Sequence, residues 1–267
     1  MQSQPASVSL DTRGLDDIAA RLSAGFAALD LFDRIAEIRT RTAGPVVFTT
    51  SFGLEDQAVT HAIFNGQLAI DVVTLDTGRL FPETYQLWAE TEQRYSRRIR
   101  ALSPERRSIE AWVAQHGIDG FRSSVEARRG CCSVRKIEPL RRALAGASAW
   151  ITGLRAEQSA DRAATPYASI DPMHQLLKLN PLLDWTRERV LGFVRQHGIP
   201  YNRLHDRGFL SIGCAPCTRA VAPGEPERAG RWWWEQNEEK ECGLHSHSAG
   251  HARGSSALSL VAARNEG

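Results

Sequence analysis

Short apolar runs alternate with longer mixed stretches along most of this chain. Four runs rich in aliphatic or β-branched residues predict buried strands, at 46–50, 69–75, 149–152 and 176–179. The stretches that predict helices lie at 17–42, 54–64, 82–95, 104–115, 134–144 and 186–196. Because strands that alternate with helices form parallel β-α-β units, the pattern predicts an α/β fold. We expect a single doubly wound, mostly parallel sheet with helices on both faces.

The two ends of the chain do not share this alternation. Residues 1–14 are polar and predict a disordered arm, whereas residues 15–230 carry the predicted sheet and its helices. From 231 onward the sequence changes to W-W-W, a charged stretch, E-C-G-L-H and a run rich in Ser, Gly and His. This composition predicts a mobile C-terminal tail at 231–267.

Bulk composition excludes several classes of protein. The chain has 267 residues with 42% hydrophobic content, enough for one sizeable core. It contains no apolar run long enough to span a bilayer, and its N-terminus lacks the pattern of a secretory signal. The net charge of +2 gives no global argument for nucleic acid. We therefore expect a cytoplasmic protein that binds neither membrane nor nucleic acid.

The five cysteines divide into four and one. Cys131 and Cys132 are adjacent, Cys214 and Cys217 form a C-x-x-C pair, and Cys242 stands apart near the C-terminus. In a reducing compartment, clustered cysteines more often bind metal or catalyse than form disulfides. Four thiolates suit zinc or an iron–sulfur cluster. Adjacent side chains on a helix diverge by about 100°, so they converge poorly on one zinc ion, which favours the cluster.

Three loops follow predicted strands, namely S-F-G-L-E-D (51–56), L-D-T-G (75–78) and G-L-R-A-E-Q-S (153–159). Open parallel sheets bind ligands at the carboxyl ends of their strands, so these loops mark the expected site. Backbone N–H groups at the helix start in the first loop can hold an anion. That loop matches neither common glycine-rich nucleotide motif.

Together the loops resemble the adenine nucleotide α-hydrolase fold, in which an S-G-G-x-D-S pyrophosphate loop follows the first strand. Here Phe52 replaces one glycine and Asp56 replaces the final serine, which argues against ATP. This variant is similar to that of adenylylsulfate and phosphoadenylylsulfate reductases of sulfate assimilation. The resemblance extends from about Phe48 to His245 and includes N-P-L-x-D-W (180–185), C-x-P-C-T and E-C-G-L-H.

The resemblance implies a chemistry for every cysteine. A C-C pair combined with C-x-x-C is typical of the branch that carries a [4Fe–4S] cluster and prefers adenylylsulfate, so Cys131, Cys132, Cys214 and Cys217 would be its ligands. Cys242 would attack the sulfate sulfur of adenosine 5′-phosphosulfate and form an S-sulfocysteine with loss of AMP. Thioredoxin or glutaredoxin would then release sulfite, which would feed cysteine biosynthesis.

The remaining site residues follow from the same resemblance. Lys136, one helical turn after Cys132, would link the charge of the cluster to the sulfate of the substrate, and His245 would close over the site. The residues expected to bind substrate are Ser51, Phe52, Gly53, Leu75, Gly153, Arg155, Arg162, Arg228 and Arg231. The arginines would neutralise the anion with their planar guanidinium groups.

Alternative functions stay open at this point. The chain could instead reduce the 3′-phosphorylated nucleotide, or both nucleotides. An iron–sulfur tRNA thiolase would need an intact ATP loop and a basic surface, and a zinc-binding module would leave Cys242 and the strand-end loops without a role. The sequence does not fix the nucleotide selectivity, the physiological dithiol donor or the oligomeric state, although W-W-W would suit an interface between copies.

Overall fold

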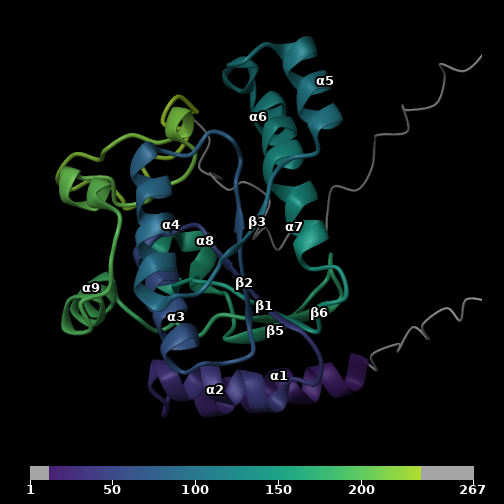
Figure 1. The fold of residues 1–267 in the computed structure, drawn as a ribbon, viewed down its shortest axis with the longest axis vertical. Coiled ribbons are helices and arrows are strands. Elements are labelled where there is room, and N and C mark those ends of the chain that lie inside the picture. Colours follow the sequence, from purple (N-terminus) through teal and green to yellow (C-terminus); the bar gives the residue numbers. More distant parts are fainter. Residues whose placement is uncertain (1–11, 236–267) are drawn as a thin grey trace, which may run out of the picture.

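A computed structural model describes residues 12–235, and within them a six-stranded sheet forms the centre of the molecule (Figure 1). The strands are β1 (Val46–Thr50), β2 (Asp71–Leu75), β3 (Arg100–Leu102), β4 (Ala149–Ile151), β5 (Ala168–Asp171) and β6 (Leu176–Leu179). Their order in the sheet is β3-β2-β1-β4-β6-β5. All neighbouring pairs are parallel except β5 with β6, so the predicted doubly wound, mostly parallel sheet is confirmed.

Helices cover both faces of this sheet. The helices are α1 (Thr12–Phe26), α2 (Leu31–Arg41), α3 (Leu54–Asn65), α4 (Pro82–Tyr95), α5 (Arg106–His116), α6 (Val125–Cys132), α7 (Glu138–Ala143), α8 (Ala160–Ala163) and α9 (Arg187–Gln196). In Figure 1, α5, α6 and α7 form a column at one end of the molecule, and α1 and α2 lie across the opposite end. No helix within residues 12–235 has the length and apolar character needed to cross a bilayer.

Alternate residues of the central strands build two separate hydrophobic layers. Val46 and Phe48 on β1 pack into a large cluster with side chains from α1, α2, α3 and α9. Val47, between them, belongs to a second cluster with Trp150 and with Leu140 of α7. Burial of each such side chain contributes about 1.5–3 kcal/mol, so this two-sided pattern holds the carboxyl ends of the strands in a fixed frame.

The sequence located most elements correctly and missed a few. The strands 46–50 and 176–179 and the helix 82–95 agree residue for residue with the structure. The single helix expected over 17–42 is wrong, because the chain forms two helices and Asp30 caps the second by accepting a hydrogen bond from the Asp33 backbone N–H (2.9 Å). The short strands β3 and β5 were not predicted.

The cysteine-bearing helix also differs from the expectation. We predicted a helix that starts near 134, directly after the C-C pair, but α6 begins at Val125 and places that pair at its carboxyl end. Ser124 caps α6 by accepting a hydrogen bond from the Ala127 backbone N–H (3.0 Å). A π-helical turn at Ser133–Ile137 then joins α6 to α7. Such turns interrupt α-helices mainly at functional sites, and this one lies between the cysteine pair and α7.

Both chain ends modify the predicted domain limits. Helix α1 begins at Thr12, inside the range expected to be a disordered arm. At the other end, Arg231 bridges to Thr218 and Trp232 is only 1% exposed, so the folded part continues to Glu235. Residues 1–11 and 236–267 lie outside the described part of the chain, and with them the predicted catalytic residues Cys242 and His245.

Candidate active site

A cavity of about 190 Å³ opens at the carboxyl ends of β1, β2 and β4. Most of the residues that the sequence assigned to substrate line it, together with one cysteine. These residues are Ser51, Gly53, Leu75, Lys136, Gly153, Arg162, Cys214, Arg228 and Arg231. Phe52 and Arg155 do not line the cavity. The three strand-end loops therefore meet at one place, as the parallel sheet predicts.

The turn after β1 contains an unusual backbone at Phe52. Its φ of +61° lies in the left-handed region, where a bulky side chain costs about 1–3 kcal/mol. The ring is 1% exposed and stacks on Trp88 with centroids 5.8 Å apart. Because this conformation turns the aromatic side chain into the core, the cavity wall at the turn is formed by its neighbours Ser51 and Gly53.

Asp56 contributes a buried carboxylate to the same wall. Its Oδ2 accepts hydrogen bonds from the backbone N–H of Ser51 (2.6 Å) and from the Ser51 hydroxyl (2.7 Å). Burial raises the pKa of Asp56 to about 6, and the neighbouring charge of Glu55 adds to this rise against the opposing hydrogen bonds. Gly153 makes room for this group, since a Cβ there would collide with Asp56 Oδ1.

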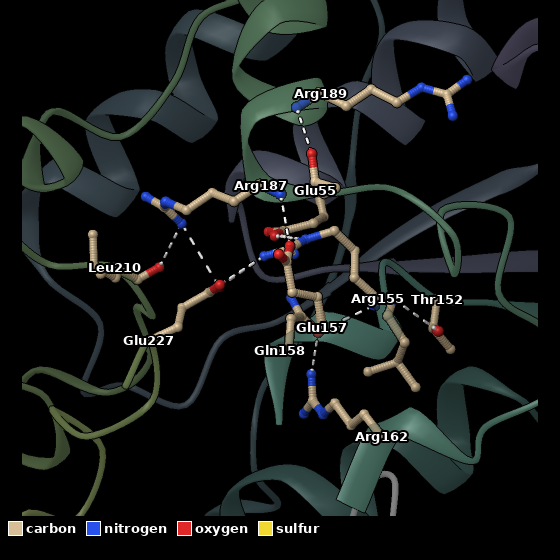
Figure 2. A network of polar contacts seen from close by, with 12 residues as sticks. Glu55, Thr152, Arg155, Glu157, Gln158, Arg162, Arg187, Arg189, Leu210 and Glu227 are labelled. Carbon is tan, nitrogen blue, oxygen red and sulfur yellow. Dashed lines mark hydrogen bonds and ion pairs between the residues drawn. The ribbon is translucent and has the colours of Figure 1, made fainter. Parts of the chain in front are cut away.

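Arg155 lies behind the cavity wall in a network of carboxylates (Figure 2). Its side chain is fully buried and bonds to Glu55 (2.7 Å), Glu157 (2.9 Å) and both carboxylate oxygens of Glu227 (2.9 and 2.8 Å). Burial alone would lower the pKa of Arg155, but the charges of Glu55 and Glu227 outweigh it and the pKa is raised. Arg155 therefore joins the start of α3 to the segment that precedes Arg228.

Four cationic side chains also line this cavity, namely Lys136, Arg162, Arg228 and Arg231. Arg231 is 6% exposed and its guanidinium lies 4.7 Å from the ring centroid of Trp232. A glycine at position 213 leaves the space for this guanidinium, because a Cβ there would overlap Arg231. These cations make the cavity suited to a phosphate or sulfate group.

All four cysteines of the described chain line a second, smaller cavity beside the first. Cys214 Sγ lies 3.3 Å from Thr77 Oγ1. Burial raises the pKa of Cys214, but Lys136, this hydrogen bond and Arg231 together lower it below its ordinary value. The pKa of Cys217 is raised to about 12 by burial and by the charge of Cys214. In residues 12–235, no group of three or more His, Cys, Asp or Glu side chains is arranged to hold a metal ion.

The thiols thus surround a cavity instead of converging on one point. A set of four soft sulfur donors from two chain segments, with Lys136 and Arg135 in the same cavity lining, suits an anionic iron–sulfur cluster, whose thiolates each bind a different iron. The two cavities share Lys136, Cys214 and Trp232 as a common wall. Any group held by the cysteines would therefore adjoin the larger cavity at Lys136.

Comparisons with known proteins show the family of this chain. Residues 45–220 match the profile of the phosphoadenosine phosphosulfate reductase domain. This chain belongs to that family. It is 51% identical to an adenosine 5′-phosphosulfate reductase from Agrobacterium fabrum over 92% of this chain and 94% of the relative. It is 56% identical to one from Rhizobium meliloti over 82% of each chain.

A solved structure of the phosphoadenosine phosphosulfate reductase family shares the fold. The phosphoadenylyl-sulfate reductase of Candida auris, determined as a phosphate complex, superposes with a TM-score of 0.66 at 26% identity. The match covers 81% of this chain and all of the other. The overall fold is therefore that of the reductase family.

Three features of this family member were not expected from its sequence. Asp56 was interpreted only as the loss of a serine hydroxyl, and Glu227 was not considered. Trp232 was expected to be a core or interface residue, and it is buried, but it also separates the two cavities. For Asp56, its position next to the modified S-F-G turn was the sequence signal that could have indicated a role in the cavity wall.

The segment that leads to Cys242 is fixed beside the cysteines. The Trp232 backbone N–H donates to the Cys217 carbonyl (3.2 Å), which ties it to the C-x-x-C loop. Arg128 of α6 is fully buried, lies 4.4 Å from the Trp232 ring centroid and bonds to Glu235 (2.5 Å). Both cysteine-bearing segments therefore contact the last described residues of the chain, Trp232 and Glu235.

Proposed function

We propose that this chain reduces adenosine 5′-phosphosulfate to sulfite and AMP, with a dithiol protein such as thioredoxin or glutaredoxin as the electron donor. The observation that carries this proposal is one cavity at the strand ends whose cationic side chains adjoin the cysteine cluster. The curated relatives that match over most of the chain are named for this nucleotide. A reductase with reduced thiols would work in the cytoplasm, where such thiols persist.

The first chemical step would be substitution at sulfur. The Cys242 thiolate attacks the sulfate sulfur of the nucleotide, so that a bond forms between Sγ and that sulfur. The bond between sulfur and the bridging oxygen breaks, and AMP leaves with the electron pair. Lys136, Arg228 and Arg231 would stabilise the charge on the leaving phosphate and on the sulfonate.

The second step would reduce the sulfur and restore the enzyme. A thiolate of the donor attacks Cys242 Sγ, and sulfite leaves with the electron pair of the bond between the two sulfurs. The second donor thiol then attacks the mixed disulfide and frees Cys242 as a thiolate. The donor is oxidised to a disulfide, which accounts for both electrons.

The chain length allows Cys242 to reach the cavity. Cys242 follows Glu235 by seven residues, and an extended chain spans about 3.3–3.6 Å per residue, so its reach is about 24 Å. The starting point of this segment adjoins Trp232, which lines the cavity itself. We propose that residues 236–267 deliver Cys242, with His245 beside it.

We further propose that Cys131, Cys132, Cys214 and Cys217 hold a [4Fe–4S] cluster. When bound, the cluster would supply charge and a covalent link between α6 and the C-x-x-C loop. Lys136 would hold the sulfate end of the nucleotide next to it. Iron and sulfide analysis with a visible absorption spectrum tests the assignment, and a protein that contained only zinc would refute it.

The decisive assay is anaerobic release of sulfite with thioredoxin. We expect turnover with adenosine 5′-phosphosulfate, and Cys242→Ser should abolish it while nucleotide binding is retained. Release of sulfite by the serine variant at the wild-type rate would end the proposed mechanism. The same assay with the 3′-phosphorylated nucleotide decides whether the chain accepts one nucleotide or both.

A further inference from the structure

One threonine of the larger cavity differs from the others in its exposure. Six threonines line this cavity, and five of them are only 1–3% exposed, namely Thr50, Thr74, Thr77, Thr84 and Thr152. The sixth, Thr49 of β1, is half-buried. We propose that the Thr49 hydroxyl donates a hydrogen bond to an acceptor atom of the nucleotide, and that Trp150 holds this hydroxyl in the donating orientation. This inference rests on the proposed binding of a nucleotide in this cavity.

The hydroxyl of Thr49 has one lone pair occupied and its hydrogen unused. A threonine hydroxyl carries one donor hydrogen and two acceptor lone pairs, whereas an indole N–H can only donate. Trp150 Nε1–H donates to Thr49 Oγ1 at 2.8 Å. Within residues 12–235, the Thr49 hydroxyl donates no hydrogen bond of its own, whereas the Thr152 hydroxyl donates to Asn180 Oδ1 at 2.6 Å. The hydrogen of Thr49 is thus available to a ligand.

The indole of Trp150 is itself held in place. It is 1% exposed, and Trp150 lies on β4 between Val47 of β1 and Lys178 of β6. The Lys178 ammonium is 4.9 Å from the ring centroid, and the His174 ring packs edge to face with centroids 5.8 Å apart. A cation over an aromatic face is attracted by the negative charge of that face. These contacts restrict the indole, so its N–H stays on Thr49.

Asp171 of β5 anchors the lysine and the histidine that contact the indole. Its Oδ1 accepts a hydrogen bond from the His174 backbone N–H (2.9 Å) and lies 2.8 Å from His174 Nδ1, while its Oδ2 lies 4.0 Å from Lys178 Nζ. Burial raises the pKa of Asp171, but the hydrogen bonds from His174 and the charge of Lys178 outweigh it, and the pKa is lowered. The ionised carboxylate in turn favours the charged form of the buried ammonium. The β5–β6 hairpin therefore supports the Thr49 hydroxyl through Trp150.

Calorimetric titration of the full-length protein with AMP tests the role of Thr49. Thr49→Val removes the hydroxyl and keeps the β-branched shape, and Thr49→Ser keeps a hydroxyl. The control Thr40→Val makes the same change as Thr49→Val on an exposed threonine of α2. We expect Thr49→Val to weaken AMP binding about five- to tenfold, because an acceptor of the ligand loses its donor. Thr49→Ser and Thr40→Val should stay within about threefold of wild type.

Wild-type affinity in Thr49→Val, or an equal loss in Thr49→Ser, would overturn the proposal. Failure of the wild type to bind AMP would instead refute the proposed function. Combining Thr49→Val with Trp150→Phe, which lacks the N–H, tests the orienting role of the indole. The loss caused by Thr49→Val should become at least about twofold smaller in this background, and the same loss in both backgrounds would refute that role.

The acceptor atom is identified with 1-deaza-, 3-deaza- and 7-deaza-AMP, in each of which a C–H group replaces one ring nitrogen of adenine. If a ring nitrogen accepts the hydrogen bond, Thr49→Val should cause no loss with the analogue that lacks this nitrogen. If the loss persists with all three analogues while Thr49→Ser still restores affinity, the acceptor is an oxygen of the ribose or of the phosphate.

Discussion

Replacement of Arg155 by methionine tests whether this arginine supports the site from behind or binds substrate. Its side chain is fully buried and bonds to Glu55, Glu157 and Glu227 (Figure 2). Methionine keeps most of the volume but leaves two largely buried carboxylates, Glu55 (12% exposed) and Glu227 (14%), without their cation. Removal of one partner from such a buried network costs about 3–5 kcal/mol. Glu157 is 53% exposed, so its share is below about 1 kcal/mol.

The sign of the pH dependence makes this prediction specific. Burial raises the pKa of Glu227 even with Arg155 present, and removal of the cation raises it further. A carboxyl whose folded pKa exceeds its unfolded value loses stability as pH rises through the folded pKa. The deficit of Arg155→Met relative to wild type should therefore be largest near pH 8 and shrink toward pH 5. Urea unfolding followed by circular dichroism at both pH values measures it.

A second substitution separates charge from packing. Adding Glu227→Gln to Arg155→Met removes one unpaired charge and should recover about 1–2 kcal/mol of the loss at pH 8. If Arg155→Met lost less than about 1 kcal/mol, or lost the same amount at both pH values, the buried network would not support the site as described.

Three further predictions concern the cavities. The pKa of Asp56 is raised from 3.8 to about 6, so its ionisation costs about 3 kcal/mol in the folded state. Asp56→Asn should therefore raise the free energy of unfolding by up to that amount at pH 8. This gain should decrease as pH falls from 6 to 4, because the carboxyl then becomes neutral in the wild type. An unchanged urea midpoint at pH 8 would contradict the prediction. Lys136→Ala should impair sulfite release while the visible absorption of the proposed cluster stays intact, and wild-type turnover would refute the proposed link of Lys136 to the substrate. Arg128→Met should leave iron content unchanged but lower kcat more than it raises KM. The reason is that Glu235 loses its ion pair and Trp232 loses the guanidinium that stacks on its ring. Equal kcat in both proteins would argue against a role for these contacts.

Much of the fold could be predicted because the strands follow simple rules. β1 reads V-V-F-T-T, a run of β-branched and aromatic residues that are buried on both faces except for the half-buried Thr49, as is typical of an inner parallel strand. The turn residues that end such strands are visible in the sequence as well, which placed the loops at 51, 75 and 153 in one cavity. Helix α6 was not predicted, because its sequence V-E-A-R-R-G-C-C has no apolar stripe and its fully buried residue is the charged Arg128.

The roles of single charged residues could not be predicted in the same way. An arginine that follows a strand in a ligand-binding loop is a natural candidate for an anion, and Arg155 was interpreted so. Its actual partners Glu55 and Glu227 lie 100 and 72 residues away in the chain, and only the folded structure brings them together. The position of Asp56 likewise depends on Gly153, which lies directly against its carboxylate although it is distant in the sequence.

The charge distribution of the cavity determines how a sulfonucleotide would lie in it. The lining combines the carboxylate of Asp56 with the cations Lys136, Arg162, Arg228 and Arg231, and such a charge distribution favours binding of an anionic group next to the cations. Because Lys136, Cys214 and Trp232 belong to both cavities, an anionic group bound to Lys136 would lie beside the cysteines. The backbone of Trp232 also carries the segment that runs to Cys242, seven residues beyond Glu235. Under the proposed function, a sulfate held by these cations would lie between the proposed cluster ligands and the proposed nucleophile Cys242, so that orientation of the nucleotide by charge would itself contribute to catalysis.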